Sequence, residues 1–222
     1  MSVSRRRFAA GIAAAGLAAA ALPFVPAAAI AQSKPKKRFE IGDLYKPGPL
    51  GDQVIGKDDA PVTIVEYASF TCGHCANFHT NTFPKLKEKY IDTGKVKLIF
   101  RVFPTGPAEL SIAAGMLAHC AGKDKYFAMT SALFETQRNW ASSADPIPVL
   151  LKLANQAGIS DEKFRECLSD KQLAQEIQMT GVRGYQTFGV EGTPTFFING
   201  TIVIDGDTTI EALSKIIDPL IK

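Results

Sequence analysis

The hydrophobic pattern predicts two strands in the first half of the chain. Residues 62–68 form an apolar, β-branched run that follows Pro61, and one carboxylate, Glu66, interrupts it. A second strand is predicted over 95–102, with Val96, Leu98, Phe100 and Val102 on one face. Between the two strands, helical spacing is marked by Phe78, Phe83, Leu86 and Tyr90. Pro84 must kink that helix or begin a new one.

From residue 107 to about residue 188 the pattern is helical, and the sequence shows no strand-like run there. Breaks at 122–124, 145–148 and 158–160 divide this region into several helices. Ser160 precedes two acidic residues, which predicts a helix N-cap.

A hairpin and a helix are expected at the end of the chain. Residues 195–198 and 201–204 are short apolar runs joined by Asn199-Gly200, a strong hairpin signal, and 208–221 is amphipathic. The order predicts one α/β domain with an α-helical block inserted. Its expected parts are an N-terminal arm (32–53), a first α/β part (54–106), the insert (107–188) and a second α/β part (189–222).

The first 31 residues predict an export signal peptide. Ser4-Arg5-Arg6-Arg7-Phe8 precedes an uncharged Ala/Gly-rich stretch, and Ala29-Ile30-Ala31 offers a cleavage site after Ala31. The arginine pair resembles a twin-arginine signal; a general secretory signal and an uncleaved anchor are the alternatives. We expect a periplasmic protein and a solvated arm at 34–38.

The net charge of the chain comes from this leader. The chain has 25 Lys and Arg against 22 Asp and Glu, and its net charge of +3 equals the three leader arginines. A neutral mature domain offers no bulk electrostatic reason to bind nucleic acid.

The candidate chemistry lies in Cys72-Gly73-His74-Cys75, directly after the first predicted strand and at the start of a helix. Unpaired N–H groups and the helix dipole favour a thiolate on Cys72, and His74 adds to this if it is protonated or hydrogen-bonding. Two alternatives are a zinc site completed by His79 and His119, and a purely structural disulfide. Neither fits well, because a zinc site favours two close cysteine pairs and so short a ring constrains little. We expect His79 to be partly exposed.

Four features of the chain occur together: Glu66, Phe70-Thr71-Cys72-Gly73-His74-Cys75, the helical insert, and Gly192-Thr193-Pro194-Thr195-Phe196. In this combination the chain resembles the DsbA family of periplasmic thiol:disulfide oxidoreductases. Members of that family have a thioredoxin fold with an inserted α-helical subdomain. The resemblance runs from about Val54 to Ile221.

The resemblance implies a role for each matching residue. Cys72 corresponds to the nucleophile, Cys75 to its buried partner and His74 to the thiolate stabiliser. Thr193 and a cis Pro194 correspond to the substrate-binding segment, and Glu66 to a buried acid that shuttles protons to Cys75. The alternatives are a trans Pro194 and an edge-facing Glu66. The chain departs from the family's prototype in Gly-His between the cysteines and in Thr193 before the proline, and the resemblance implies that both positions tune the redox potential.

Cys120 and Cys167 both fall in the predicted insert, where an oxidising compartment favours a structural disulfide; free buried thiols are the alternative. We expect an enzyme that introduces disulfides into exported proteins. An isomerase or reductase, and a thioredoxin-like chaperone or peptide-binding module, are the competing functions. The resemblance implies reoxidation by a DsbB-like quinone-linked membrane oxidase. Isomerases of this kind usually carry an extra N-terminal dimerisation domain, which residues 32–60 are too few to build, so we expect a monomer. We expect no cofactor or metal.

Overall fold

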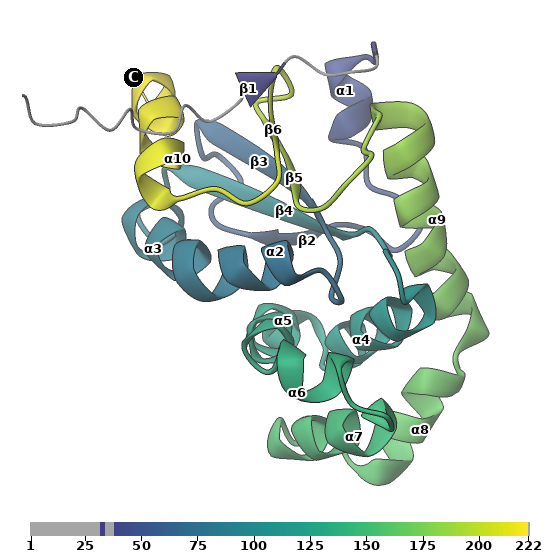
Figure 1. Ribbon diagram of the computed structural model, residues 1–222. Coiled ribbons are helices and arrows are strands. Elements are labelled where there is room, and N and C mark those ends of the chain that lie inside the picture. Colours follow the sequence, from purple (N-terminus) through teal and green to yellow (C-terminus); the bar gives the residue numbers. More distant parts are fainter. Residues whose placement is uncertain (1–31, 34–37, 222) are drawn as a thin grey trace, which may run out of the picture.

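A computed structural model describes residues 32–33 and 38–221 of the chain (Figure 1). The predicted export signal (1–31) and most of the basic arm (34–37) lie outside these residues. Among the described residues, no helix is long and apolar enough to cross a membrane.

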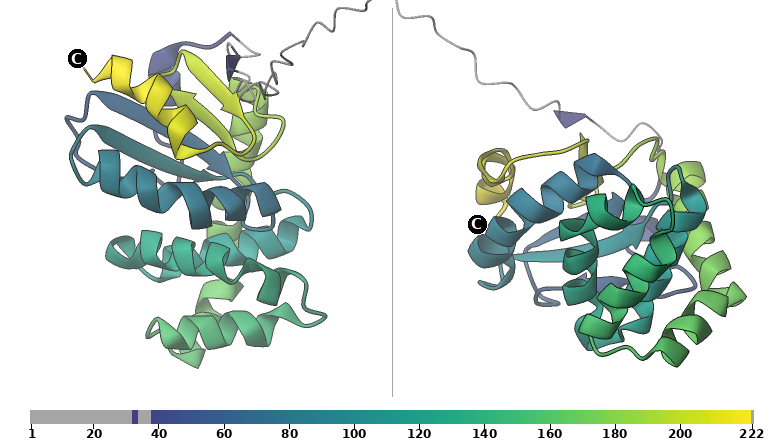
Figure 2. Two further views of the ribbon diagram at one scale, coloured as in Figure 1. Left: turned by 60° about the vertical axis from the view of Figure 1, so that its left-hand side comes forward. Right: turned by 60° about the horizontal axis from the view of Figure 1, so that its bottom comes forward.

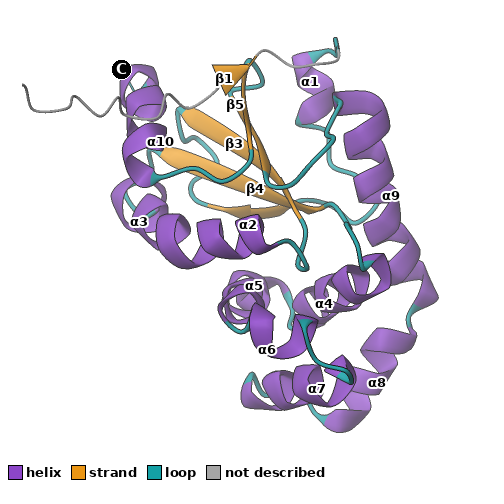
Figure 3. Ribbon diagram, in the orientation of Figure 1, coloured by secondary structure: helices purple, strands orange, loops and turns teal. Residues whose placement is uncertain are grey.

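A six-stranded sheet forms the centre of the upper part of the molecule (Figure 3). Its strand order is β1-β6-β5-β3-β4-β2, where the strands are β1 (Gln32–Ser33), β2 (Gln53–Ile55), β3 (Val62–Ala68), β4 (Val96–Val102), β5 (Thr195–Ile198) and β6 (Ile202–Asp205). β3 and β4 are parallel, and the other pairs are antiparallel. Both strands predicted before residue 107 are confirmed, and the sequence analysis missed the edge strands β1 and β2.

The hairpin is also confirmed, with Asn199 and Gly200 both at positive φ. Ile198 pairs with Ile202, so three residues form the connection, and the Thr201 N–H donates to the Ile198 carbonyl at 3.2 Å. The final amphipathic segment forms α10 (Ile210–Ile217) and a short 3-10 turn, Asp218–Leu220.

The helical stretch after the cysteine pair runs through four short segments: α2 (Gly73–Asn77), a π-helix (Phe78–Thr82), α3 (Phe83–Leu86) and a second π-helix (Lys87–Ile91). Pro84 occupies the first turn of α3, where its missing N–H is tolerated. The sequence therefore predicted the interruption at Pro84 but not the two π-helical segments, which change which side chains face the sheet.

The helical insert consists of α4 (Ala108–Cys120), α5 (Tyr126–Glu135), α6 (Gln137–Ala141), α7 (Pro146–Gln156), α8 (Asp161–Ser169) and α9 (Lys171–Phe188), with a 3-10 turn at Lys123–Lys125. It stacks below the sheet, and α9 returns along the sheet's side near α1 (Ile41–Leu44) (Figures 1 and 2). The Ser160 N-cap is confirmed, since its hydroxyl accepts from the Lys163 N–H at 3.2 Å.

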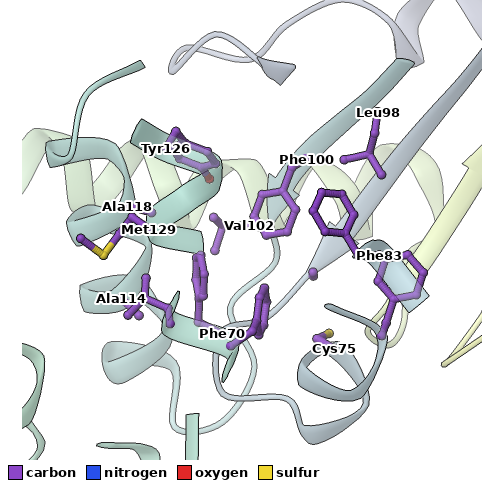
Figure 4. Packing of buried hydrophobic residues seen from close by; sticks show 14 of the residues in the cluster. Phe70, Cys75, Phe83, Leu98, Phe100, Val102, Ala114, Ala118, Tyr126 and Met129 are labelled. Carbon is purple, nitrogen blue, oxygen red and sulfur yellow. The ribbon is translucent and has the colours of Figure 1, made fainter. Parts of the chain in front are cut away.

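Alternation along the strands divides the core between the two faces of the sheet. Val62, Ile64 and Ala68 face the larger cluster, which includes residues of α2, α3, α10 and the insert (Figure 4). Val65 and Tyr67 face a smaller cluster with Leu44 and Phe188. Glu66 has the same parity as Ile64 and Ala68, so β3 directs this carboxylate into the larger apolar cluster.

Candidate active site

Cys72 lies at the N-cap of α2, on the loop that joins β3 to this helix. It is partly exposed, whereas Cys75, one turn further along, is fully buried; neither forms a disulfide in this structure. As a thiol, Cys72 donates to the Thr193 carbonyl at 3.2 Å. The strand-to-helix junction thus presents one sulfur atom to the surface and buries the other.

The pKa of Cys72 is lowered from 9.0 to about 5. The largest cause is a hydrogen bond from the Cys75 side chain to the Cys72 sulfur. The Thr193 side chain and the backbone N–H groups of Cys75 and His74 add to the effect, while partial burial opposes it. Each of these contacts favours the thiolate, which is the reactive form of cysteine.

Cys75 has the opposite environment. Burial raises the pKa of Cys75 well above 9.0. The hydrogen bond between the Cys75 and Cys72 side chains and the charges of Cys72 and Glu66 raise this pKa further. The Ser69 N–H, which donates to Cys75 Sγ at 3.5 Å, opposes these effects. At neutral pH the pair therefore holds one thiolate, on Cys72, and one thiol, on Cys75.

Glu66 is fully buried, and its Oε1 lies 2.9 Å from His79 Nε2. The expectation that His79 is partly exposed was wrong, because only 2% of its surface is accessible. His79 follows Cys75 by four positions and so shares its inward-facing side of the helix. Glu66 Oε2 and His79 Nδ1 have no hydrogen-bond partner among the residues that the structure describes.

The Thr193–Pro194 peptide is cis, and Pro194 is buried. This segment precedes β5, which pairs with β3, so the sheet brings Thr193 beside Cys72 although the two are 121 residues apart. The His74 side chain is exposed, and its backbone N–H is the part that contributes to the low pKa of Cys72.

Cys120 and Cys167 form a disulfide between α4 and α8. His119, next to Cys120, packs edge-on against Tyr126, and burial lowers its pKa to about 4. No group of three or more metal-ligating side chains occurs within residues 32–33 and 38–221. His79 and His119 therefore lie in separate environments, one beside Glu66 and the other beside Tyr126.

Sequence reasoning missed the polar residues of the insert that contact the cysteine loop. Gln137 Nε2 donates to the carbonyls of Phe70 at 2.7 Å and Cys72 at 2.9 Å. Ser111 Oγ accepts from the Phe70 N–H at 3.2 Å and lies 2.9 Å from Ser69 Oγ. Serine and glutamine in a helical pattern carry no signal that would single them out.

The sequence of this chain is similar to those of known proteins. Residues 50–219 match a family model described as Thioredoxin. A Rickettsia bellii protein provisionally named a protein-disulfide oxidoreductase is 33% identical over 127 residues, or 57% of this chain and 48% of that protein. Disulfide bond formation protein D of Bacillus subtilis is 30% identical over 140 residues, covering 60% of this chain and 61% of that protein. The chain spans about half the length of the Rickettsia relatives that it matches, between 46% and 55%.

Solved structures are similar over more of the chain. The crystal structure of Wolbachia pipientis alpha-DsbA1 is 32% identical, with a TM-score of 0.74 over 82% of this chain and 96% of that one. Oxidised BdbD from Bacillus subtilis is 27% identical, with a TM-score of 0.69 over 79% and 96%. Sequence, fold and the position of the Cys72–Cys75 pair agree, and the chain belongs to the thioredoxin family as one of its DsbA-like members.

Proposed function

We propose that the protein is a thiol:disulfide oxidoreductase that introduces disulfides into exported proteins through Cys72 and Cys75. The observation that carries this proposal is the opposed environment of the two sulfurs: Cys72 has a pKa near 5 and is partly exposed, whereas Cys75 is buried with a raised pKa. A structural disulfide does not require its two sulfur atoms to differ in exposure or in pKa. Exchange chemistry needs this difference, because one sulfur must meet the substrate while the other completes the enzyme's disulfide.

The reaction begins with the oxidised Cys72–Cys75 disulfide. A substrate thiolate attacks Cys72 Sγ, the bond to Cys75 breaks, and a mixed disulfide forms. A second substrate thiolate attacks the substrate sulfur of that mixed disulfide, and Cys72 leaves as a thiolate. The substrate loses two electrons and gains a disulfide, while the enzyme gains those electrons as its reduced pair. The low pKa of Cys72 makes it a good leaving group.

The surrounding residues support the two ends of this exchange. Thr193 lies within hydrogen-bonding distance of Cys72, where its backbone can bind an extended substrate segment beside the reacting sulfur. His74 supports the thiolate through its backbone N–H. Cys75 leaves with a raised pKa and needs a proton. Glu66 is the buried carboxyl close enough to act electrostatically on Cys75, and it would relay that proton.

Export to the periplasm, with cleavage after Ala31, is part of the same proposal. An oxidising compartment accounts for the Cys120–Cys167 disulfide and for substrates that need disulfides. A DsbB-like quinone-linked membrane oxidase would return the reduced pair to its oxidised form, and the protein would act as a monomer. Whether residues 5–7 direct the twin-arginine route is tested by Arg5→Lys/Arg6→Lys, which should stop export only if that route is used.

The experiment that tests the activity is paired denaturation of the oxidised and reduced forms, together with the reduction potential measured against glutathione buffers. Stabilisation of the Cys72 thiolate favours the folded dithiol, and the same free energy makes the disulfide more oxidising. We expect the reduced form to be the more stable one. A more stable oxidised form would instead indicate a reductase, and a pair that never exchanges with glutathione would indicate a binding module.

A further inference from the structure

Three helices of the insert contact the loop that carries Cys72. Ser111 of α4 accepts from the Phe70 N–H, and Gln137 of α6 donates to the Phe70 carbonyl. Phe134 of α5 stacks on the Phe70 ring, with centroids 4.9 Å apart and planes inclined by 22°. Both backbone polar groups of Phe70, which is fully buried, are therefore bound by side chains of the insert.

Of these three insert residues, Gln137 also contacts the backbone of Cys72 itself. Its side-chain amide has two hydrogens, and it donates to the carbonyls of Phe70 and Cys72 at 2.7 and 2.9 Å. These carbonyls belong to the 70–71 and 72–73 peptide groups, so one side chain holds both ends of the segment that contains Thr71 and the reactive Cys72. Gln137 is 7% exposed, and this burial shields its bonds from competition with water.

We propose that Gln137 is a positioning residue for Cys72, through which the helical insert sets the reactivity of the redox pair. The inference rests on the proposed function, since it concerns the same sulfur. Gln137 acts on the backbone of Cys72 and makes no contact with the reacting sulfur that the structure records.

The bond to the Cys72 carbonyl has two consequences for the thiolate. The peptide group that contains this carbonyl also contains the Gly73 nitrogen at the start of α2, so holding the carbonyl orients the N-terminus that faces the sulfur. A carbonyl oxygen is a partial negative charge beside the thiolate, and an amide that donates to it offsets that charge. Loss of Gln137 should therefore raise the pKa of Cys72 and make the protein a weaker oxidant.

Three variants test this in the full-length protein. Gln137→Met keeps the length and volume of the side chain and removes both hydrogen bonds. Gln137→Glu is isosteric, and its carboxylate oxygens cannot donate to the two carbonyls and repel them. Trp140→Phe is the matched control, because Trp140 lies on the same helix, is fully buried, and donates to Leu133 within the insert at 2.9 Å.

The readouts are the pKa of Cys72, from thiolate absorbance, and the reduction potential against glutathione buffers. We expect Gln137→Met to raise the pKa by up to about one unit and to lower the equilibrium constant for substrate oxidation by up to about tenfold, equivalent to about 30 mV. Gln137→Glu should shift both values further in the same direction. Trp140→Phe should lower the melting temperature and leave both values unchanged.

A Gln137→Met protein that is less stable but keeps the wild-type pKa and potential would overturn the proposal and leave Gln137 a purely structural residue. So would Trp140→Phe shifting both values as far as Gln137→Met. Should Gln137→Met fail to fold, Gln137→Asn, whose shorter amide cannot span both carbonyls, is judged by the same two outcomes. The proposed function fails separately, if the wild-type pair does not exchange with glutathione at all.

Discussion

Cys72 and Cys75 are three positions apart at the start of one helix, whereas Cys120 and Cys167 are 47 positions apart and join two helices of the insert. The first pair is reduced in the structure and the second is bonded. The first lies where a helix N-terminus, Thr193 and a buried carboxylate converge; the second closes a long loop of helical chain.

The difference shows that surroundings decide what a cysteine pair does. A four-residue ring removes little entropy from the unfolded chain, so its disulfide stabilises the fold little. We expect thiolate stabilisation to outweigh that small gain and to favour the reduced pair. Closing a 47-residue separation removes far more entropy, and around Cys120 and Cys167 no contact to a helix N-terminus favours a thiolate in the described structure.

The largest effect that separates the two pairs is the loss of exchange. Cys72→Ser should abolish oxidation of a reduced substrate peptide, because it removes the sulfur that substrate attacks. Cys75→Ser should instead accumulate mixed disulfides, since the enzyme loses the thiol that releases a trapped substrate. Non-reducing gels of each variant with a periplasmic extract provide the measurement. Trapping by Cys72→Ser but not by Cys75→Ser would show that the two roles are reversed.

Removing the second pair should change stability and not chemistry. Cys120→Ala/Cys167→Ala should lower the free energy of unfolding by about 4 kcal/mol, the chain-entropy value for a loop of this length. Urea denaturation gives the loss, and peptide oxidation below the melting temperature gives the rate. A folded double variant with lost activity would contradict a purely structural bridge.

The two pairs should also differ in their dependence on pH. The Cys72 pKa is about 5 in the folded protein against 9.0 ordinarily, so its thiolate contributes stability in full above about pH 9. That contribution falls as pH drops from 9 toward 5 and is lost below 5. As pH falls from 9 toward 5, the difference in the free energy of unfolding between the reduced and the oxidised form should therefore decrease.

Paired denaturation curves between about pH 4 and pH 8 measure this change. The loss caused by Cys120→Ala/Cys167→Ala is the control, since a disulfide does not titrate and its loss should stay constant over the same range. An advantage of the reduced form that does not change with pH would mean that the Cys72 thiolate is not its source.

The smallest effect concerns the proton on Cys75. Glu66→Gln keeps a side chain of the same shape beside His79 and removes the acid, so mixed-disulfide formation should slow by about tenfold. Stopped-flow fluorescence of the oxidised enzyme with a reduced peptide measures that step. His79→Gln is the matched variant, because it replaces the imidazole beside Glu66 with an amide while leaving the carboxyl in place. An unchanged rate in Glu66→Gln would remove Glu66 from the mechanism.

Much of the fold could be predicted because its signals are local. The apolar, β-branched run of β3, the alternation in β4, the Asn199-Gly200 turn and the Ser160 cap each depend on a few neighbouring residues. The edge strands β1 and β2 are two and three residues long, too short for a periodic signal. The two π-helical segments lie in a stretch whose apolar residues keep ordinary helical spacing, so that spacing does not reveal them.

The reactive pair could be inferred from the sequence, since two cysteines at a strand-to-helix junction carry their chemistry in their spacing. The residues around that pair could not, because they come from distant segments of the chain. Thr193 reaches Cys72 because β5 pairs with β3, and Gln137 reaches it because the insert folds back onto the loop. His79 lies between these cases: its four-residue spacing from Cys75 was visible, but its contact with Glu66 required the sheet. The periodicity of apolar residues shows which face of a helix or strand is buried. It does not show which distant segment packs against that face, and this is why these contacts could not be predicted.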